Sequence, residues 1–295
     1  MRTGRLAVIA VALVVVSACR REGGGAVDAD PLAGARSLVE QGRYDEAIAR
    51  IGGAPGADAQ YLLGRAWVGK AQGAPVPTPP PGATPGGSRL KPEEALALEC
   101  FERALAERPD HAGAHLAIAD LLAPQALAAE AAGKPGAGAA GAPDTGVDRV
   151  LRSYGSAAQA DPAGTTALEA LVRVATATGR LDEADLAFRE LVRRRPEDPG
   201  LLVRYGDFLA TRKRDAEAAL ERYGQALIWR PDDTSTRTKV AEIHLAAASA
   251  LLSQRQYALA EARLREARRL ALDPASAPAR HLVELEARLR EIRGR

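Results

Sequence analysis

The 295-residue chain has the composition of a folded protein. Hydrophobic residues make up 46% and charged residues 26% of the chain, which excludes wholesale disorder. Aromatic residues make up only 4%, too few for a β-sandwich or a β-barrel. Two cysteines, Cys19 and Cys100, cannot build a disulfide framework or a zinc site. The formal charge of +2 gives no strong reason to expect a nucleic-acid partner.

The first 18 residues predict a secretory signal peptide. Arg2 and Arg5 supply its positive start, and residues 6–16 are an unbroken apolar run, shorter than the roughly 18 residues of a membrane-spanning helix. The run ends in Val16-Ser17-Ala18-Cys19. This ending resembles the lipobox of bacterial lipoproteins, which implies that Cys19 is acylated and becomes the new N-terminus. An ordinary cleaved signal with a chance cysteine, or an uncleaved anchor, are the alternatives.

Cleavage before Cys19 would change the charge of the mature chain. It removes Arg2 and Arg5 and leaves 38 basic residues against 38 acidic ones. The mature chain is then formally neutral, so no basic surface argues for nucleic acid or anionic lipid.

The remainder divides into a tether, a repeat domain and two insertions. Residues 19–30 are small and polar, which predicts a flexible tether. Residues 31–293 are rich in Ala, Leu, Glu and Arg, with apolar residues three and four apart, as in amphipathic helices. Residues of about 73–90 and 133–147 are rich in Pro and Gly and predict loop insertions into this domain.

A repeat of 34–35 residues organises the helical part. Pro196 and Pro231 are 35 residues apart, and Phe188 and Tyr223 keep the same step. A step of 34 residues back from Pro196 reaches Pro162. The pattern resembles the tetratricopeptide (TPR) repeat, a helix–turn–helix unit. The resemblance implies an all-α protein, an α-solenoid of TPR-like pairs with a C-terminal capping helix. We expect six pairs, at about 31–54, 58–109, 112–162, 165–196, 199–231 and 234–273, and a closing helix over 278–293.

The clearest unit begins at Thr165. Within it, Gly179 matches the small residue of the family before the turn, and Ala184 matches the small residue where the two helices cross. Phe188 matches the large side chain that fills the next gap, and Pro196 ends the second helix. The family pattern departs at Lys213, at Arg222 and in a lengthened first helix around 236–253.

Few residues suggest chemistry. His111 and His115 have the four-residue spacing of a two-histidine metal face, but no third ligand follows at a recognised spacing. Cys100 lies on an apolar helical stripe beside Phe101, which favours a buried structural role. The run 193–195 of three arginines falls at a helix end, where cations complement the helix dipole. We therefore expect no enzyme activity, no metal and no cofactor.

The TPR resemblance also implies where a partner binds. TPR arrays hold a peptide or helix in the groove lined by the first helix of each pair. The matching positions in this chain are Leu116, Asp120, Glu169, Arg173, Val203, Asp207, Thr238 and Glu242. None of them is Lys and the chain has no Asn, which disfavours the carboxylate-clamp type of TPR groove. The mixture predicts a groove for a polar, partly basic or amphipathic protein segment.

Together these features predict a lipid-tethered TPR scaffold that mediates protein–protein interactions in bacterial envelope assembly. Proteins that it resembles serve pilus, secretin, outer-membrane-protein or cell-wall machinery, and the sequence does not choose among them. Arg20 stands where an aspartate retains lipoproteins in the inner membrane of some bacteria, so the outer membrane, facing the periplasm, is favoured. The alternatives are a TPR protein with an uncleaved anchor and, less favoured, an envelope hydrolase or metal-binding protein. The oligomeric state is left open.

Overall fold

The computed structural model describes residues 32–73, 90–133 and 146–294. The predicted signal peptide 1–18, Cys19 and the tether 19–30 lie outside the described residues, as do most residues of the two predicted insertions. Helix α3 ends at Gly73 and helix α6 begins at Gly146, so both helices reach into the predicted insertion ranges. The described residues form two compact units, one within residues 32–114 and one within residues 115–294.

Unit 1 consists of two short helices followed by two longer ones. They are α1 (Ala33–Glu40), α2 (Tyr44–Ile51), α3 (Ala57–Gly73) and α4 (Pro92–Glu107). The ring of Phe101 in α4 is fully buried and lies against Gly64 of α3, where a Cβ atom would come within 2.5 Å of the ring. Glycine at this position therefore permits the close approach of the two helices.

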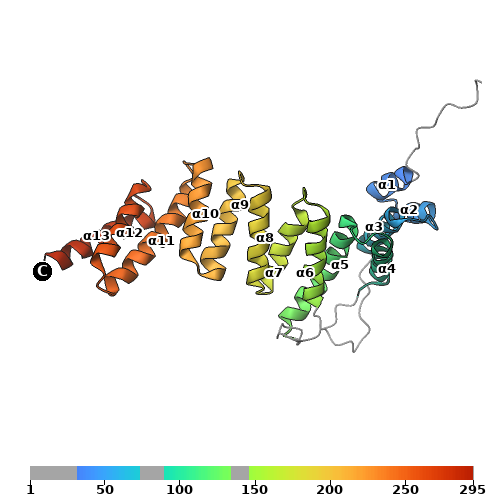
Figure 1. Cartoon of the computed structure of the whole chain (residues 1–295), viewed down its shortest axis with the longest axis horizontal. Helices are drawn as coiled ribbons and strands as arrows, with labels where there is room; N and C mark the ends of the chain where they lie inside the picture. The colour runs from blue at the N-terminus through green and yellow to red at the C-terminus, as the bar shows by residue number, and fades with distance from the viewer. Residues whose placement is uncertain (1–31, 74–89, 134–145, 295) are drawn as a thin grey trace, which may run out of the picture. The chain divides into compact units, whose positions relative to one another are not determined.

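Unit 2 is a series of packed helices. Its helices are α5 (Ala112–Ala131), α6 (Gly146–Ala160), α7 (Thr166–Ala177), α8 (Leu181–Arg194), α9 (Pro199–Phe208), η1 (Leu209–Lys213), α10 (Ala216–Trp229), α11 (Thr234–Ser253), α12 (Tyr257–Arg269) and α13 (Ala277–Arg293). From α6 onward, consecutive helices lie side by side in chain order (Figure 1). This serial packing is the architecture of an α-solenoid.

The predicted fold class is confirmed. The six predicted helix pairs correspond to α1–α2, α3–α4, α5–α6, α7–α8, α9–α10 and α11–α12, and no strand occurs among the described residues. The pairs α7–α8 and α9–α10 close around the small residue that the repeat places at the crossing. Ala184 and Ala219 are both fully buried there, and the absence of larger side chains lets the helices approach.

The turn after α7 uses the glycine that the repeat predicts. Gly179 has a φ of +73°, a left-handed conformation that glycine adopts without steric cost. In the preceding residue, the Thr178 hydroxyl donates a hydrogen bond to the carbonyl of Val174 at 2.9 Å. The sequence thus ends α7 and starts α8 with only three residues between them.

A π-helical turn accounts for the step of 35 residues. The segment from the start of the second helix to the closing proline has the same length in both repeats, at Leu181 to Pro196 and Ala216 to Pro231. The extra residue of the second repeat therefore lies before α10. There α9 continues as the π-helix η1, which is followed by Arg214 with a φ of 56°. A π-turn accommodates one extra residue inside a helix. This turn explains why the pattern departs from the TPR consensus at Lys213.

The closing helix α13 covers the end of the stack. Leu285 and Leu289 are buried in a cluster with residues of α11 and α12, and Leu282 packs against the same cluster. Its exposed positions carry charged side chains such as Glu284 and Arg288. This is the polar outer surface that a terminal repeat needs.

Helix α5 is the most apolar helix. Among the described residues it is the one helix that is long and apolar enough to cross a membrane by length and composition. Core helices of soluble proteins have the same composition. Ala119, Ala123 and Ala126 of α5 are buried in the main core of unit 2, so α5 serves as a packing surface for α6.

Candidate functional site

The predicted groove residues lie on α5, α7, α9 and α11, the first helices of four pairs. Leu116 and Val203 are half-buried and pack against the core. The hydroxyl of Thr238 donates to the carbonyl of Thr234, one turn earlier in its own helix. The side chains at these three positions therefore contribute to packing and to hydrogen bonding within the protein. The charged positions are the ones that could interact with a partner.

Asp120 and Arg173 meet at Tyr154. The Tyr154 hydroxyl donates to the Asp120 carboxylate at 2.7 Å, linking α6 to α5. Burial and Asp120 raise the pKa of Tyr154, whereas the nearby Arg173 guanidinium of α7 lowers it. The acid, the phenol and the base thus form a cluster over three successive helices.

Asp207 lies at the centre of a second cluster of the same kind. The Tyr223 hydroxyl of α10 donates to its carboxylate at 2.7 Å. The Lys239 ammonium of α11 donates to both carboxylate oxygens, at 2.6 and 2.7 Å. Burial first, and then Asp207 and Glu242, raise the pKa of Tyr223, so Glu242 lies near this cluster too.

Lys239 was missed by the sequence analysis, which placed Thr238 on this face. The helix α11 begins at Thr234, with the carboxylate of Asp233 accepting from the backbone N–H groups of Ser235 and Thr236. This cap fixes the rotation of the helix so that Lys239, the residue after Thr238, reaches Asp207. None of the eight predicted positions is Lys, but Lys239, the residue after Thr238, contacts Asp207 on this face.

The remaining predicted residue, Glu169, pairs at 3.4 Å with Arg195, which follows the end of α8. Arg195 also donates to the hydroxyl of Thr165. We use the name helix-A face for the surface that carries Asp120, Arg173, Asp207, Lys239 and Glu242. Arg173 and Glu242 are exposed, and both are available to charged or polar groups of a partner.

A third acidic group lies between α8 and α9. Asp185 is buried and accepts from the Tyr205 hydroxyl at 2.6 Å and from Arg189 at 2.8 Å. The π-turn brings Lys213 to 3.3 Å from the same carboxylate. Burial opposes ionisation of Asp185, but the bonds from Tyr205 and Lys213 and the charge of Arg189 lower its pKa. Both of its carboxylate oxygens accept hydrogen bonds inside the protein, which indicates a structural role.

A groove of about 610 Å³ lies between α6 and α8, over α7. We call it the α6–α8 groove. Its apolar lining comes from Leu151, Ala158, Leu168, Leu171, Leu186 and Ala187, and its polar lining includes Asp148, Arg152, Glu183, Glu190 and Arg194. Its volume falls within the range of about 300–1,000 Å³ that is typical of ligand-binding clefts. The sequence analysis did not predict this groove, because it assigned binding to the first helices only.

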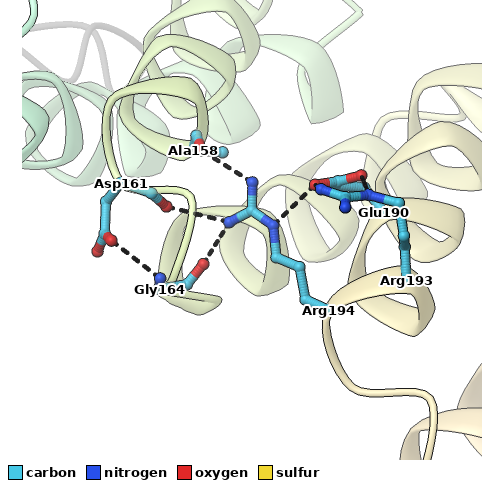
Figure 2. A network of polar contacts seen from close by, with 6 residues as sticks. All are labelled: Ala158, Asp161, Gly164, Glu190, Arg193 and Arg194. Carbon is cyan, nitrogen blue, oxygen red and sulfur yellow. Dashed lines mark hydrogen bonds and ion pairs between the residues drawn. The ribbon is translucent and has the colours of Figure 1, made fainter.

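Arg194 is one of the polar residues that line the groove, and Figure 2 shows the contacts of its side chain. Its guanidinium donates to the carbonyl oxygens of Ala158 at 2.9 Å, Asp161 at 3.1 Å and Gly164. Its Nε donates to Glu190 at 2.8 Å. Bonds from Arg193 and Arg194 lower the pKa of Glu190 to about 2. Arg194 therefore has a structural role, because it binds the carbonyl groups at the end of α6.

The histidines and Cys100 have structural surroundings. The Nδ1 of His111 accepts from the backbone N–H of Ala114 at 3.1 Å, at the start of α5. His244 is buried in α11, and burial lowers its pKa. Cys100 is buried, as predicted, and burial raises its pKa. Among the described residues, no three His, Cys, Asp or Glu side chains form a group that could hold a metal ion.

The central part of unit 2 matches a known repeat family. Residues 148–199 and 170–234 match the sequence profile of the tetratricopeptide repeat. This profile describes a repeat and names no enzyme family. No curated protein sequence matches the chain.

Several solved structures are similar to this chain. MamA AMB-1 is 19% identical, with 68% of this chain and 89% of that chain covered and a TM-score of 0.41. The C-terminal part of a TPR repeat-containing protein from Cytophaga hutchinsonii is 14% identical, with 84% of each chain covered and a TM-score of 0.48. YrrB, described as a TPR protein with an unusual peptide-binding site, is 18% identical, with 68% and 86% covered and a TM-score of 0.43. Because these TM-scores are below 0.5, the repeats are identified from the sequence match over residues 148–234.

Proposed function

Because residues 148–234 are tetratricopeptide repeats, we propose that this protein is a non-enzymatic scaffold that binds protein segments on its helix-A face. The observation that carries the proposal is the row of charged side chains on this face. Tyr154 and Tyr223 hold Asp120 and Asp207 in place, while the neighbouring Arg173 and Glu242 stay exposed. A pre-organised polar face with exposed charges of both signs suits a polar or amphipathic protein segment.

We further propose that the scaffold is tethered to a membrane through lipid on Cys19. The support is the sequence Val16-Ser17-Ala18-Cys19 after a short apolar run. Two or more acyl chains give stable anchoring where a single chain is marginal. The tether would place the repeats in the periplasm, on the outer membrane, where the scaffold would act in assembling pili, secretins, outer-membrane proteins or the cell wall.

Metabolic labelling with alkyne palmitate tests the tether. The full chain is expected to incorporate label, and Cys19→Ala is expected to lose it. Mass spectrometry of the purified chain should find no Met1, because the signal peptide has been removed. Label that persists in Cys19→Ala, or an intact Met1, would contradict lipidation and favour an uncleaved anchor.

Charge reversal on the helix-A face tests the binding surface. Arg173→Glu and Glu242→Lys change exposed groups and leave both Asp–Tyr bonds in place. Proteins cross-linked to the full chain in native membranes are expected to be lost from both variants. Arg265→Glu of α12 and Glu284→Lys of α13 make the same charge changes at exposed positions elsewhere. These two control variants should retain the cross-linked proteins. Identical partners in all four variants would refute the helix-A face as the binding surface.

A further inference from the structure

The α6–α8 groove lies apart from the helix-A face. Two of its walls are the second helices of successive pairs, and Leu168 and Leu171 of α7 form its floor. On its α8 side, Leu186 is 64% exposed. An exposed leucine beside an apolar cleft marks a surface that gains free energy when a partner covers it.

Gly155 opens the groove. It lines the cleft from α6, and a Cβ atom built on it would meet no atom within 4 Å. A larger residue therefore fits the helix without a clash but would project into the cleft. The position follows the buried Tyr154, and the same position two repeats later is Gly224, which follows Tyr223. Gly224 has equally open surroundings and is not part of the groove.

The charges that line the groove leave one carboxylate without a cation. Arg194 is bound by backbone carbonyls and Glu190, and Asp148 is paired with Arg180 at 3.0 Å. Arg152, the other cation in the lining, also has an interaction partner within the protein. Glu183, in the first turn of α8, is exposed and has no ion-pair partner among the described residues. The end of the groove that Glu183 lines therefore favours a positively charged group of a partner.

We propose that the α6–α8 groove is a second docking site, which takes an amphipathic α-helix of a partner protein. The helix presents aliphatic side chains one turn apart to Leu168, Leu171 and Leu186, and a Lys or Arg at one end to Glu183. A helix suits the cleft because its walls are themselves two helices, and side-chain ridges of a third helix pack into such a channel. The cation supplies the charge complementarity that Glu183 lacks inside the protein.

Binding of designed peptides to the purified full chain tests the proposal. The probe is a fluorescent helix-forming peptide with leucines at i, i+4 and i+7 and lysines at one end. Matched peptides carry glutamates in place of the lysines, or a proline in the middle. Anisotropy titration is expected to show binding of the lysine peptide, with the other two about tenfold weaker or more. Equal binding of all three peptides, or no binding of the lysine peptide, would overturn the proposal.

Protein variants locate the site of binding. Gly155→Leu is expected to weaken binding of the lysine peptide about tenfold or more, and Glu183→Lys to reverse the preference between lysine and glutamate peptides. Gly224→Leu makes the same substitution at the matching position and should bind as the wild type does. Leucine also has a higher helix propensity than glycine, so both glycine variants should melt at or above the wild-type temperature. Unchanged binding by Gly155→Leu would refute the groove as the site.

Discussion

The guanidinium of Arg194 in α8 donates to the carbonyl oxygen of Ala158 in the last turn of α6, at 2.9 Å. The last carbonyls of a helix have no partner within the helix. Here the following helix pair supplies that partner, and the same guanidinium reaches Asp161 and Gly164 in the turn between α6 and α7 (Figure 2). One side chain thus joins two successive repeats.

Replacement of Arg194 by alanine is expected to destabilise the protein by about 2–3 kcal/mol, because it leaves several carbonyls next to the core without a charged donor. The side chain is only 10% exposed, so water does not readily replace it. Arg193→Ala is the matched control, since Arg193 shares the partner Glu190 but is exposed, and it should cost less than about 0.5 kcal/mol. Urea unfolding measures both values, and equal costs would contradict the role given to Arg194.

Stability should fall in acid through Glu190. Its pKa is lowered to about 2 in the folded protein, against about 4.3 in an unfolded chain. The carboxylate therefore stabilises the fold fully above the unfolded pKa, and this contribution is lost as the pH falls from about 4.3 towards 2. Glu190→Gln should lose less stability than the wild type over this range. Glu197→Gln removes an exposed carboxylate nearby and should follow the wild-type curve; the same slope in all three proteins would refute the assignment.

Substitution by alanine should have opposite effects on stability at Gly206 and at Gly224. At Gly206 of α9 a Cβ atom would come within 2.5 Å of the Tyr223 ring, and the hydroxyl bond to Asp207 holds that ring in place. The overpacking cost of about 1–3 kcal/mol should exceed the gain in helix propensity of about 1 kcal/mol. Gly224→Ala meets no atom and should be stabilising. Thermal unfolding of the two variants measures the contrast, and a stabilising Gly206→Ala would show that the ring can move.

The two aspartates that contact Lys213 should differ in importance. Asp185 has a side chain that is 7% exposed, whereas the Asp182 side chain is 89% exposed. Asp185→Asn removes the buried charge that Arg189 and Lys213 face and should cost about 1–3 kcal/mol. Asp182→Asn should stay within about 0.5 kcal/mol of the wild type. Denaturant unfolding gives both numbers, and an equal effect would mean that burial of Asp185 does not matter.

The helix pairs could be predicted because each repeat marks its own closure. Ala184, Phe188 and Pro196 recur as Ala219, Tyr223 and Pro231, and these residue types act locally, through helix crossing, gap filling and helix termination. The positions of Asp120 and Asp207 on the first helices followed from the same register. The π-turn was signalled only by the extra residue in the second step, which does not say where in the repeat it falls.

The groove could not be predicted in the same way. Its walls come from α6 and α8, and its volume depends on how far these helices stand apart, which no single segment encodes. Leu186, one helical turn from Glu183 and from Glu190 in α8, was the one local sign, and single exposed leucines are common on protein surfaces. Lys239 was missed for a different reason: the cap at Asp233 sets the rotation of α11, and a shift of one residue moves a side chain by about 100° around the helix.

The π-turn at Leu209–Lys213 also determines how the chain tolerates an added residue. One residue inserted into a β-strand would send every later side chain to the opposite face. Here the extra residue is absorbed within one helical turn, and Tyr223 still reaches Asp207 as Tyr154 reaches Asp120. The phase of the array is restored before the next repeat begins, so the length of one unit can vary without disturbing the units that follow it.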